Sequence, residues 1–390
     1  MSEDSYTKVT SESWLSRIGG AFKGIIFGGI MFLVSFVVLW MNEGRAVKTR
    51  KALEEGQGKV VSVSCEKVDP ANDGKLIHMS GAAKVEQMLR DPEFGVEAKA
   101  VKLKRVVEMF QWVEHKETKS KKKLGGSKET TTKYSYAKEW SDKPVDSSRF
   151  DTTKGHENPG RFPCQSLEWS AGKVLLGAFE LSPGLVKQMN DFTPLEIEKI
   201  GMEASLSKKL KDRAKVSNGE IYIGKKPGSP KVGDVRVKFM VVEPGEVSVI
   251  AQQTGHTFQP APTKVGKSLE MLSMGKHSAR EMFQSALASN KTMTWILRLV
   301  GFLLMGFGLS LVFRPLSVIA DVVPIIGSIV GAGTGVVAFL IAGVLSLVTI
   351  AVAWIVFRPL FAAVIFALAA VVAVLVIVKM KKGKAAKVPA

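Results

Sequence analysis

The sequence predicts an α+β protein in which a strand-rich extracytoplasmic domain is inserted between α-helical membrane spans, one N-terminal and three C-terminal. Three observations predict this class. Long uncharged runs occur near both ends of the chain, the middle has the composition of a soluble domain, and apolar residues alternate in several short segments of that middle. With 46% hydrophobic residues among 390, the chain is too apolar for extended disorder.

The first predicted span covers residues 21–41 and follows a cytoplasmic tail of residues 1–20. Its core, Gly24–Met41, is uncharged, and at about 1.5 Å per residue it would cross most of a hydrocarbon layer about 30 Å thick. A cleaved signal peptide is the alternative. The apolar run is long for one, and residues 40–43 lack the small side chains of a cleavage site, so we expect an uncleaved anchor.

Three further spans are expected in the C-terminal part of the chain, at residues 293–313, 330–357 and 359–378. Residues 325–357 carry no charge, but as one helix they would be about 50 Å long, too long for one upright crossing. We therefore assign 316–329, which contains Asp321, to an interfacial or re-entrant segment.

Charge predicts the orientation of these spans. Four spans place both termini on one side, and the lysines of the basic tail, residues 379–390, mark that side as cytoplasmic. Basic residues directly after the first span argue the other way. They begin a loop of about 250 residues, and long loops translocate largely regardless of charge. We expect both termini to be cytoplasmic.

Residues 42–290 form the predicted extracytoplasmic or luminal domain, with 42 Lys or Arg and 32 Asp or Glu. Alternating apolar residues predict a long hairpin with a Lys-rich loop and a tip at Gly125-Gly126. A second hairpin is expected around Glu243-Pro244-Gly245. The predicted strands are 75–80, 106–114, 133–140, 235–242 and 246–252.

Helices are expected at three places in this domain. Ser182-Pro183 and Thr193-Pro194 each fit an N-cap followed by proline, the second opening the stretch 195–215. Ser278 to Glu281 fits a capping box. The helix that it begins should continue without a break through Trp295 into the second span.

The sequence carries no recognisable catalytic constellation. Gly266-Lys267-Ser268 resembles the end of a phosphate-binding loop, but Ala261 stands where the earlier glycine is required. The five histidines have no metal-ligand spacing. We therefore expect no enzyme activity, cofactor or metal. Cys65 and Cys164 could pair in an oxidising compartment or remain two buried thiols.

Two sets of residues are candidates for contacts in the membrane. Glycines at four-residue spacing place small residues on one helix face, which favours close packing between spans or subunits, although chance register is the alternative. The glycines are Gly20, Gly24, Gly28, Gly327, Gly331 and Gly335. Lysines in the hairpin loop could contact anionic lipid, with a solvated tip as the alternative. They are Lys119, Lys121, Lys122 and Lys123.

Arg298 and Asp321 are the charges nearest membrane depth. If they are buried, they would form an ion pair or line a polar path. Because both lie close to predicted span ends, anchoring at the interface is the favoured interpretation. Nucleic-acid binding is not expected despite the net charge of +18, since the aromatics near the basic loop fit a strand face and not a stacking platform.

Several ordered motifs resemble the transmembrane protein 43 (LUMA) family. They run from about residue 24 to 378 and include Asn42-Glu43-Gly44-Arg45, Asp91-Pro92-Glu93-Phe94-Gly95-Val96, Val107 to Glu114, Val232-Gly233-Asp234 and Phe357-Arg358-Pro359-Leu360. The resemblance implies four spans with a large domain between the first two, and termini on the cytoplasmic or nucleoplasmic side. It supplies no catalytic residues. The Lys-rich hairpin departs from the animal pattern.

The resemblance also suggests a function. Animal members are described as oligomeric organisers of the endoplasmic reticulum and inner nuclear membrane that associate with emerin and lamins, and bacterial relatives would lie in the plasma membrane. We therefore expect a non-enzymatic, self-associating membrane scaffold whose partners are the lipid bilayer, further copies and other membrane proteins. A channel or transporter subunit with a polar path near Arg298 and Asp321 is the alternative.

Overall fold

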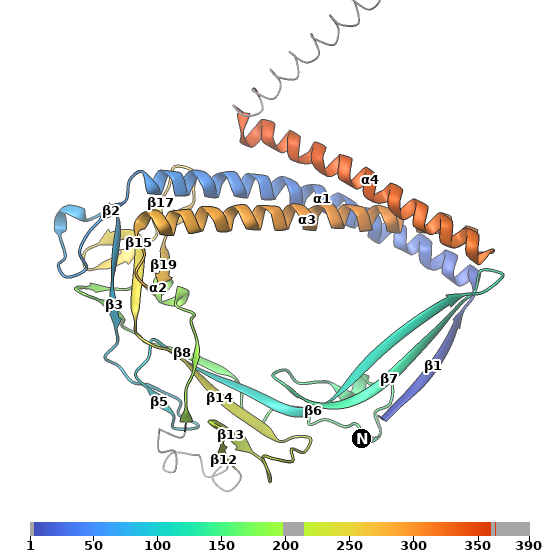
Figure 1. Cartoon of the computed structure of the whole chain (residues 1–390), viewed down its shortest axis with the longest axis horizontal. Coiled ribbons are helices and arrows are strands. Elements are labelled where there is room, and N and C mark those ends of the chain that lie inside the picture. The colour runs from blue at the N-terminus through green and yellow to red at the C-terminus, as the bar shows by residue number, and fades with distance from the viewer. Residues whose placement is uncertain (1–3, 198–213, 360–362, 364–390) are drawn as a thin grey trace, which may run out of the picture. The chain divides into compact units, whose positions relative to one another are not determined.

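The computed structural model describes residues 4–197, 214–359 and 363, and it confirms the α+β class (Figure 1). The chain divides into two compact units. The domain unit comprises Met1–Thr10, Ala52–Lys119 and Thr130–Ser285, and the helical unit comprises Ser11–Lys51, Ser120–Glu129 and Ala286–Ala390. Each unit is described by itself below.

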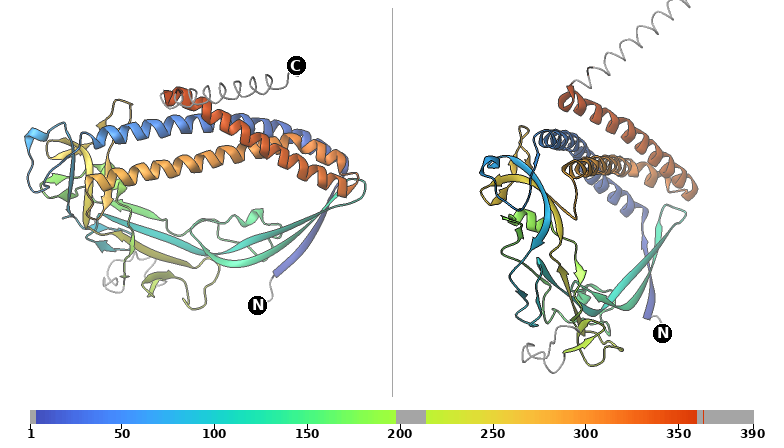
Figure 2. Two further views of the ribbon diagram at one scale, coloured as in Figure 1. Left: turned by 45° about the horizontal axis from the view of Figure 1, so that its top comes forward. Right: turned by 60° about the vertical axis from the view of Figure 1, so that its left-hand side comes forward.

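Three helices in the described part of the chain are long and apolar enough to cross a membrane (Figure 2). They are α1, Trp14–Gln57; α3, Ala279–Ala320; and α4, Pro324–Phe357. The fourth expected span, 359–378, and the basic tail, 379–390, lie outside the described residues except for Pro359 and Ala363. The segment 316–329 is divided among the end of α3, a short turn and the start of α4, and its depth in a membrane stays a prediction.

Two of the expected helix starts are confirmed. The short helix α2, Pro183–Gln188, is capped by Ser182, whose hydroxyl accepts a hydrogen bond from the Leu185 amide. At the start of α3, Ser278 and Glu281 form the reciprocal bonds of a capping box, and the helix then continues without a break past Trp295.

An eight-stranded sheet contains the predicted Lys-rich hairpin, β6 and β7, which turns through Gly125 and Gly126 at positive φ. The N-terminal residues, expected as a plain tail, form strand β1 next to β7 at one edge. In spatial order the strands are β1, Asp4–Glu12; β7, Lys128–Ser141; β6, Lys102–Lys122; β14, Val235–Val242; β13, Glu220–Ile223; and β12, Ala214–Ser217, while β8, Leu167–Ser170, pairs with β6 and β11, Thr193–Pro194, with β14.

A second, seven-stranded sheet lies in the domain unit. The pairings of β3, β9, β10, β16 and β15 form a closed ring, because β15 also pairs with β3. The strands are β19, Met271–Met274; β15, Glu246–Thr254; β16, Thr257–Gln259; β10, Phe179–Glu180; β9, Leu175–Leu176; β3, Leu76–Lys84; and β2, Val61–Ser62. Two small ribbons complete the unit: β4, Leu89–Arg90, with β5, Glu97–Ala98, and β17, Ala261–Pro262, with β18, Ser268–Leu269.

Two local predictions are wrong. The strands at 235–242 and 246–252 exist, but they do not form a hairpin, because β14 pairs with β6 and β15 pairs with β3 in the other sheet. The three residues Glu243-Pro244-Gly245 thus carry the chain from one sheet to the other. Thr193-Pro194 is not a helix start but the short strand β11, and most of the stretch 195–215 lies outside the described residues.

The hydrophobic core of the domain unit draws on both sheets. Buried side chains on β3, β6, β14 and β15 meet in one cluster, which includes Ile77, Val107, Val237 and Val249. An ion pair is buried at its side. Arg105, 2% exposed, donates at 2.8 Å to Asp91, which is fully buried, and Arg105 also lies over the ring of Phe94. Hydrogen bonds on both partners make such burial tolerable.

Candidate functional site: two buried charge clusters of the helical unit

The helices of the helical unit approach one another at glycines. A Cβ atom added to Gly28 would lie only 2.6 Å from the carbonyl oxygen of Gly308, so α1 and α3 touch backbone to backbone there. Of the other predicted glycines of α1, Gly24 makes an ordinary contact with the Leu311 oxygen at 3.9 Å, and Gly20 has nothing within 4 Å. The sequence pattern did not include Gly308.

The glycines at the start of α4 have different surroundings. A side chain at Gly327 would overlap the carboxylate of Asp321, so this glycine leaves room for a buried charge. Gly331 lies against Ser317, with its added Cβ 3.4 Å from the serine Cβ, and Gly335 has nothing within 4 Å. Within residues 4–197, 214–359 and 363, only part of each glycine face is therefore in contact with other parts of the chain.

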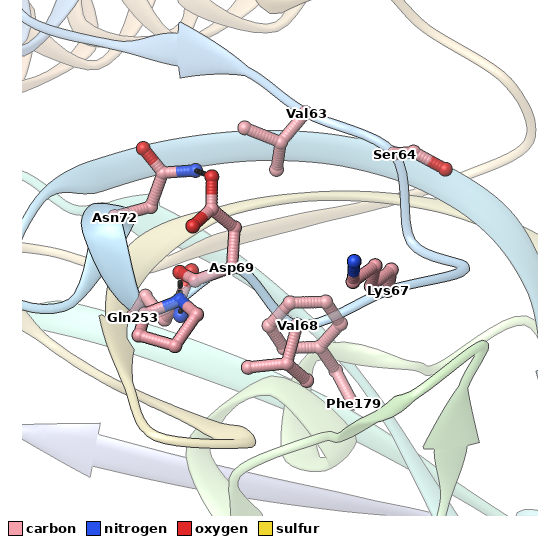
Figure 3. Close-up of a pocket in the computed structure, with 9 residues that line it drawn as sticks. Val63, Ser64, Lys67, Val68, Asp69, Asn72, Phe179 and Gln253 are labelled. Carbon is pink, nitrogen blue, oxygen red and sulfur yellow. Dashed lines mark hydrogen bonds between the residues drawn. The ribbon is translucent and has the colours of Figure 1, made fainter.

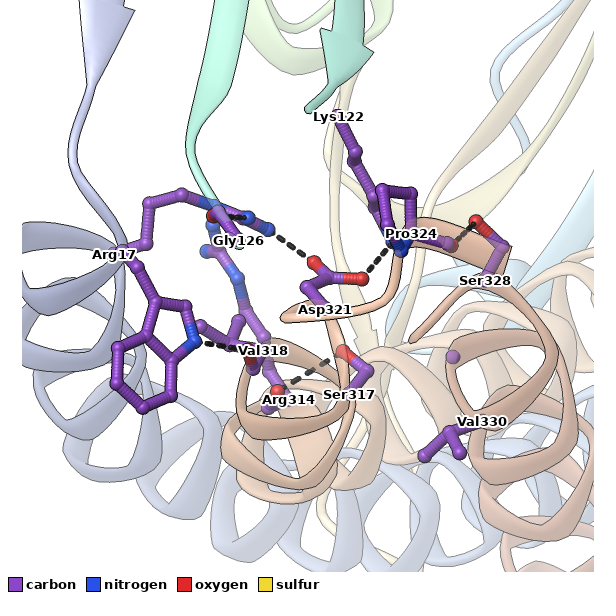
Figure 4. A network of polar contacts seen from close by, with 12 residues as sticks. Arg17, Lys122, Gly126, Arg314, Ser317, Val318, Asp321, Pro324, Ser328 and Val330 are labelled. Carbon is purple, nitrogen blue, oxygen red and sulfur yellow. Dashed lines mark hydrogen bonds and ion pairs between the residues drawn. The ribbon is translucent and has the colours of Figure 1, made fainter. Parts of the chain in front are cut away.

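The first charge cluster surrounds Asp321, in the turn between α3 and α4 (Figure 4). Its carboxylate is 1% exposed and binds two cations, Arg17 at the start of α1 and Lys122 at the hairpin tip, the latter at 2.6 Å. Arg17 is itself 6% exposed and also donates to the carbonyl of Gly126. The cluster joins three segments that are distant in the sequence.

Two further hydrogen bonds form at this end of the helical unit, one between α1 and α3 and one from the hairpin tip to the turn after α3. The indole of Trp14 donates to the Val318 carbonyl at 2.8 Å, and the Gly125 amide donates to the Val322 carbonyl at 3.0 Å. Glycine is required at 126, because a Cβ atom there would collide with the Trp14 ring. The tip therefore has defined partners in the helical unit.

The four candidate lysines have different roles in the structure. Lys122 forms an ion pair with Asp321, and Lys123 forms one with Glu129 of the next strand. Lys119 and Lys121 have exposed side chains on β6. Contact of any of them with anionic lipid stays a prediction.

The second charge cluster surrounds Glu43, near the opposite end of the apolar stretch of α1. Glu43 is fully buried and accepts hydrogen bonds from Arg298 of α3 at 2.7 Å and from the indole of Trp354 of α4 at 2.9 Å. Arg358, directly after α4, lies 4.0 Å from the same carboxylate. The guanidinium groups of Arg298 and Arg358 also lie over the Trp354 ring, at 5.7 and 5.6 Å from its centroid.

The two clusters are about one bilayer apart. Arg17 and Glu43 are 26 residues apart on α1, or about 39 Å, and Asp321, directly after α3, is 23 residues from Arg298, or about 35 Å along the helix. The hydrocarbon layer of a bilayer is about 30 Å thick. The spacing of the two buried clusters along the helices is therefore comparable to the thickness of a bilayer.

The sequence named one partner of each cluster and missed the other. Arg298 and Asp321 do not meet each other, since each pairs with a residue of α1 at its own end of α3. Arg17 and Glu43 were missed. A signal for them was present in the sequence. Arg17 and Glu43 flank the apolar run of α1 at a separation similar to that of Arg298 and Asp321, which flank the apolar run of α3.

Two polar groups that line a pocket of the domain unit make hydrogen bonds within its structure. A pocket of about 510 Å3 is lined by Lys67, Asp69 and Gln253 among others (Figure 3). The Asp69 carboxylate accepts the Ala71 amide and caps a short 3-10 helix, while the Gln253 amide donates to the Asp69 carbonyl. Within residues 4–197, 214–359 and 363, no group of three or more His, Cys, Asp or Glu could hold a metal ion.

The two cysteines are both buried and free. Burial raises the pKa of Cys164 to about 11, and burial together with Glu66 raises the pKa of Cys65. A raised pKa lowers the fraction of the nucleophilic thiolate at neutral pH.

Comparison with known proteins identifies the family. A sequence model described as Transmembrane protein 43 matches residues 109–359. The chain is 38% identical to Transmembrane protein 43 of Rattus norvegicus over 387 residues, which cover 95% of this chain and 94% of the relative. It is 37% identical to the Homo sapiens protein, covering 94% and 93%, and 32% identical to the Drosophila melanogaster homolog, covering 87% and 90%.

The chain belongs to the transmembrane protein 43 family. No solved structure matches it. Membership and the three apolar helices make it an integral membrane protein. Glu43, Arg298, Trp354 and Arg358 lie in the shared region, and they form the second charge cluster.

Proposed function

We propose that this member of the transmembrane protein 43 family is a non-enzymatic, multi-pass scaffold that self-associates and organises membrane structure or membrane protein complexes. One observation carries the proposal. Among the described residues the glycine faces of α1 and α4 are only partly covered, because a Cβ atom added at Gly20 or Gly335 would meet none of their atoms within 4 Å. Small residues with open space in front of them allow a helix of a second copy to approach closely.

The apolar surface of the helical unit supports the same proposal. Large side chains on all three helices are exposed, among them Ile26, Leu299 and Leu347. Much of this surface meets lipid, and part of it would be shared between copies. Candidate partners are therefore the bilayer, a second copy and other membrane proteins, of the emerin or lamin type if the host is eukaryotic.

The proposed location is the endoplasmic reticulum and inner nuclear membrane in a eukaryote, or the plasma membrane in a bacterium. The basic tail would be cytoplasmic. One observation opposes the expected side of the N-terminus. Residues of β1 pair with β7, and Tyr6 stacks on Tyr134 with ring centroids 5.1 Å apart. β1 precedes α1 and β7 follows it, so a single crossing by α1 would place the two strands on opposite sides of the membrane. Two strands on opposite sides of a bilayer cannot pair.

The contacts do not favour a channel that uses Arg298 and Asp321. Each residue is committed to an ion pair, and the two lie about 35 Å apart along α3. A conducting path near both would need those pairs to break, which is costly for buried charges.

Crosslinking in native membranes tests self-association. We expect crosslinked dimers or larger species from the wild-type chain, and a severalfold loss in Gly20→Leu and Gly335→Leu. The control is Gly228→Ser, a change in a turn of the domain unit where φ is not positive and the added Cβ atom would meet no atom of the described residues within 4 Å. A strict monomer, or crosslinking that is unaffected by both leucine substitutions, would rule out this packing face.

A further inference from the structure

A groove lies between α1 and α4 at the level of the second charge cluster. It measures about 420 Å3 and is lined by Phe36, Val37, Trp40, Val348, Thr349 and Val352. Thr349 is the one lining residue with a hydroxyl, and that hydroxyl already donates to the Leu345 carbonyl at 2.7 Å. The groove therefore offers apolar surface, and its volume is in the range of small-ligand sites.

An excess of positive charge stands at one end of this groove. Trp40 packs on Phe357 with ring centroids 5.5 Å apart, and Arg358 follows directly. Arg298 and Arg358 share the single carboxylate of Glu43. A third guanidinium, that of Arg45, has only neutral hydrogen-bond partners in this cluster, namely Asn42, Asn290 and Thr294.

The cluster is therefore incomplete as an ion-pair site. Arg298 and Arg358 share the single carboxylate of Glu43, and Arg45, two residues further along α1, bonds neutral groups, so the cations at this end of the groove outnumber the acidic groups that pair with them. In addition, the buried Nε atom of Arg45 has no hydrogen-bond partner among the described residues. Partly buried guanidinium groups at the edge of an apolar slab are stabilised by a bound anion.

We propose that the groove and this arginine cluster together bind one anionic phospholipid. The phosphate lies at Arg358, whose side chain is 29% exposed and can donate two parallel hydrogen bonds. One acyl chain lies along the groove. The geometry suits a lipid, because Trp40 and Val352 are within one helical turn of Glu43 and Trp354.

Charge favours a lipid over other occupants of the groove. The chain's own residues 359–378 contain no Asp or Glu and would leave the arginine cluster unneutralised. A second copy would bring the same excess of positive charge. A zwitterionic lipid carries its own cation, so it offsets less of the charge than an anionic lipid does.

Native mass spectrometry of the full chain in mild detergent tests the proposal. The probes are phosphatidylglycerol and phosphatidylcholine with identical acyl chains. We expect phosphatidylglycerol to be retained at least tenfold better by the wild type. Arg358→Gln should lower that retention roughly tenfold, because a charge-assisted hydrogen bond is lost. Val348→Trp, which fills the groove, should abolish specific retention of either lipid.

Two variants serve as matched controls. Arg314→Gln removes an exposed arginine at the opposite end of the helical unit, and Leu347→Trp adds the same ring at a 68% exposed position outside the groove. Both should retain phosphatidylglycerol as the wild type does. Arg358→Lys keeps the positive charge, so it should keep part of the phosphatidylglycerol retention. This partial retention would show that the loss in Arg358→Gln is due to the charge and not to a folding defect.

Three results would overturn the proposal. The first is equal retention of both lipids by the wild type, which indicates ordinary annular lipid. The second is unchanged phosphatidylglycerol retention in Arg358→Gln and Val348→Trp. The third is a disulfide in membranes between Val348→Cys and Leu368→Cys, which would mean that the chain's own segment fills the groove. None of these results depends on self-association.

Discussion

Replacing Asp321 by Asn should destabilise the helical unit more than any other conservative change at a charged residue of the first cluster. The carboxylate is 1% exposed and neutralises Arg17, which is 6% exposed. Without it, Arg17 keeps a buried charge with no counter-ion, at a cost of roughly 3–5 kcal/mol. The Lys122 pair adds less than about 1 kcal/mol, because that side chain is 32% exposed and keeps much of its hydration.

Equilibrium unfolding in mixed micelles with double-mutant cycles measures this difference. The cycle of Asp321→Asn with Arg17→Met should give a coupling of about 2 kcal/mol or more, and the cycle with Lys122→Met less than about 1 kcal/mol. Asp151→Asn is the matched control, since its pair with Lys8 is exposed and should contribute less than about 1 kcal/mol. A loss below about 1 kcal/mol for Asp321→Asn, or a larger coupling to Lys122, would refute the reasoning.

Four further predictions concern other parts of the chain. Gly28→Leu should weaken a disulfide-trapped contact between α1 and α3 and lower thermal stability, whereas Gly20→Leu should leave both unchanged; equal effects would contradict the packing. Burial lowers the pKa of His78, although the hydrogen bond to the His277 carbonyl acts in the opposite direction. The domain unit should therefore lose stability as the pH falls below about 6.5. Melting curves recorded at several pH values should show that His78→Gln weakens this pH dependence. With its pKa near 11, Cys164 should react with maleimide at pH 8 roughly a hundredfold more slowly when folded than when unfolded; fast labelling of the folded chain would contradict its burial. Leu124→Cys at the hairpin tip and Val322→Cys in the turn after α3 should both react with an impermeant reagent from the same side of the membrane, and labelling from opposite sides would mean that the tip does not dock there.

The sign of the His78 effect follows from burial of the ring, which outweighs the bond to the His277 carbonyl. The neutral ring donates from Nε2 to the His277 carbonyl and accepts from Ser62 at Nδ1. Protonation would remove the acceptor and place a charge in a buried site. The stabilisation is therefore complete above the unfolded pKa of about 6.5 and is lost as the pH falls through the lowered folded pKa.

The sequence predicted helix starts and strands well where neighbouring residues in the chain determine them. The capping box at Ser278 and Glu281, the cap at Ser182 and the alternation in β6 depend on residues within a few positions of each other. The same signals could not choose between partners. β14 and β15 each read as a strand, but their assignment to separate sheets depends on pairing with β6 and β3 more than a hundred residues away.

Proline gave an ambiguous signal. Thr193-Pro194 has the residues of an N-cap and first turn, as Ser182-Pro183 does, yet it forms the short strand β11. Proline is also tolerated on an edge strand, where no ladder donor is needed. The pairing of Pro194 with Met240 decided between the two structures, and that contact is not visible in the local sequence.

The charge clusters could be predicted only in part. An uncharged run shows where a helix meets lipid, so Arg298 and Asp321 were recognised as charges at span ends. Their partners lie 255 and 304 residues away, and a single sequence carries no direct record of such contacts. For the same reason the sequence did not distinguish Lys122 from the other three candidate lysines. Of these four described lysines, Lys122 is the one that pairs with the buried Asp321 carboxylate.

Particle stoichiometry after extraction into native lipid discs tests the central claim most directly. A self-associating scaffold predicts a defined oligomer of the full chain, with co-purifying membrane proteins, and a shift toward monomer in Gly20→Leu and Gly335→Leu. A uniform population of monomers that carries no other protein, at native expression levels, would contradict the account.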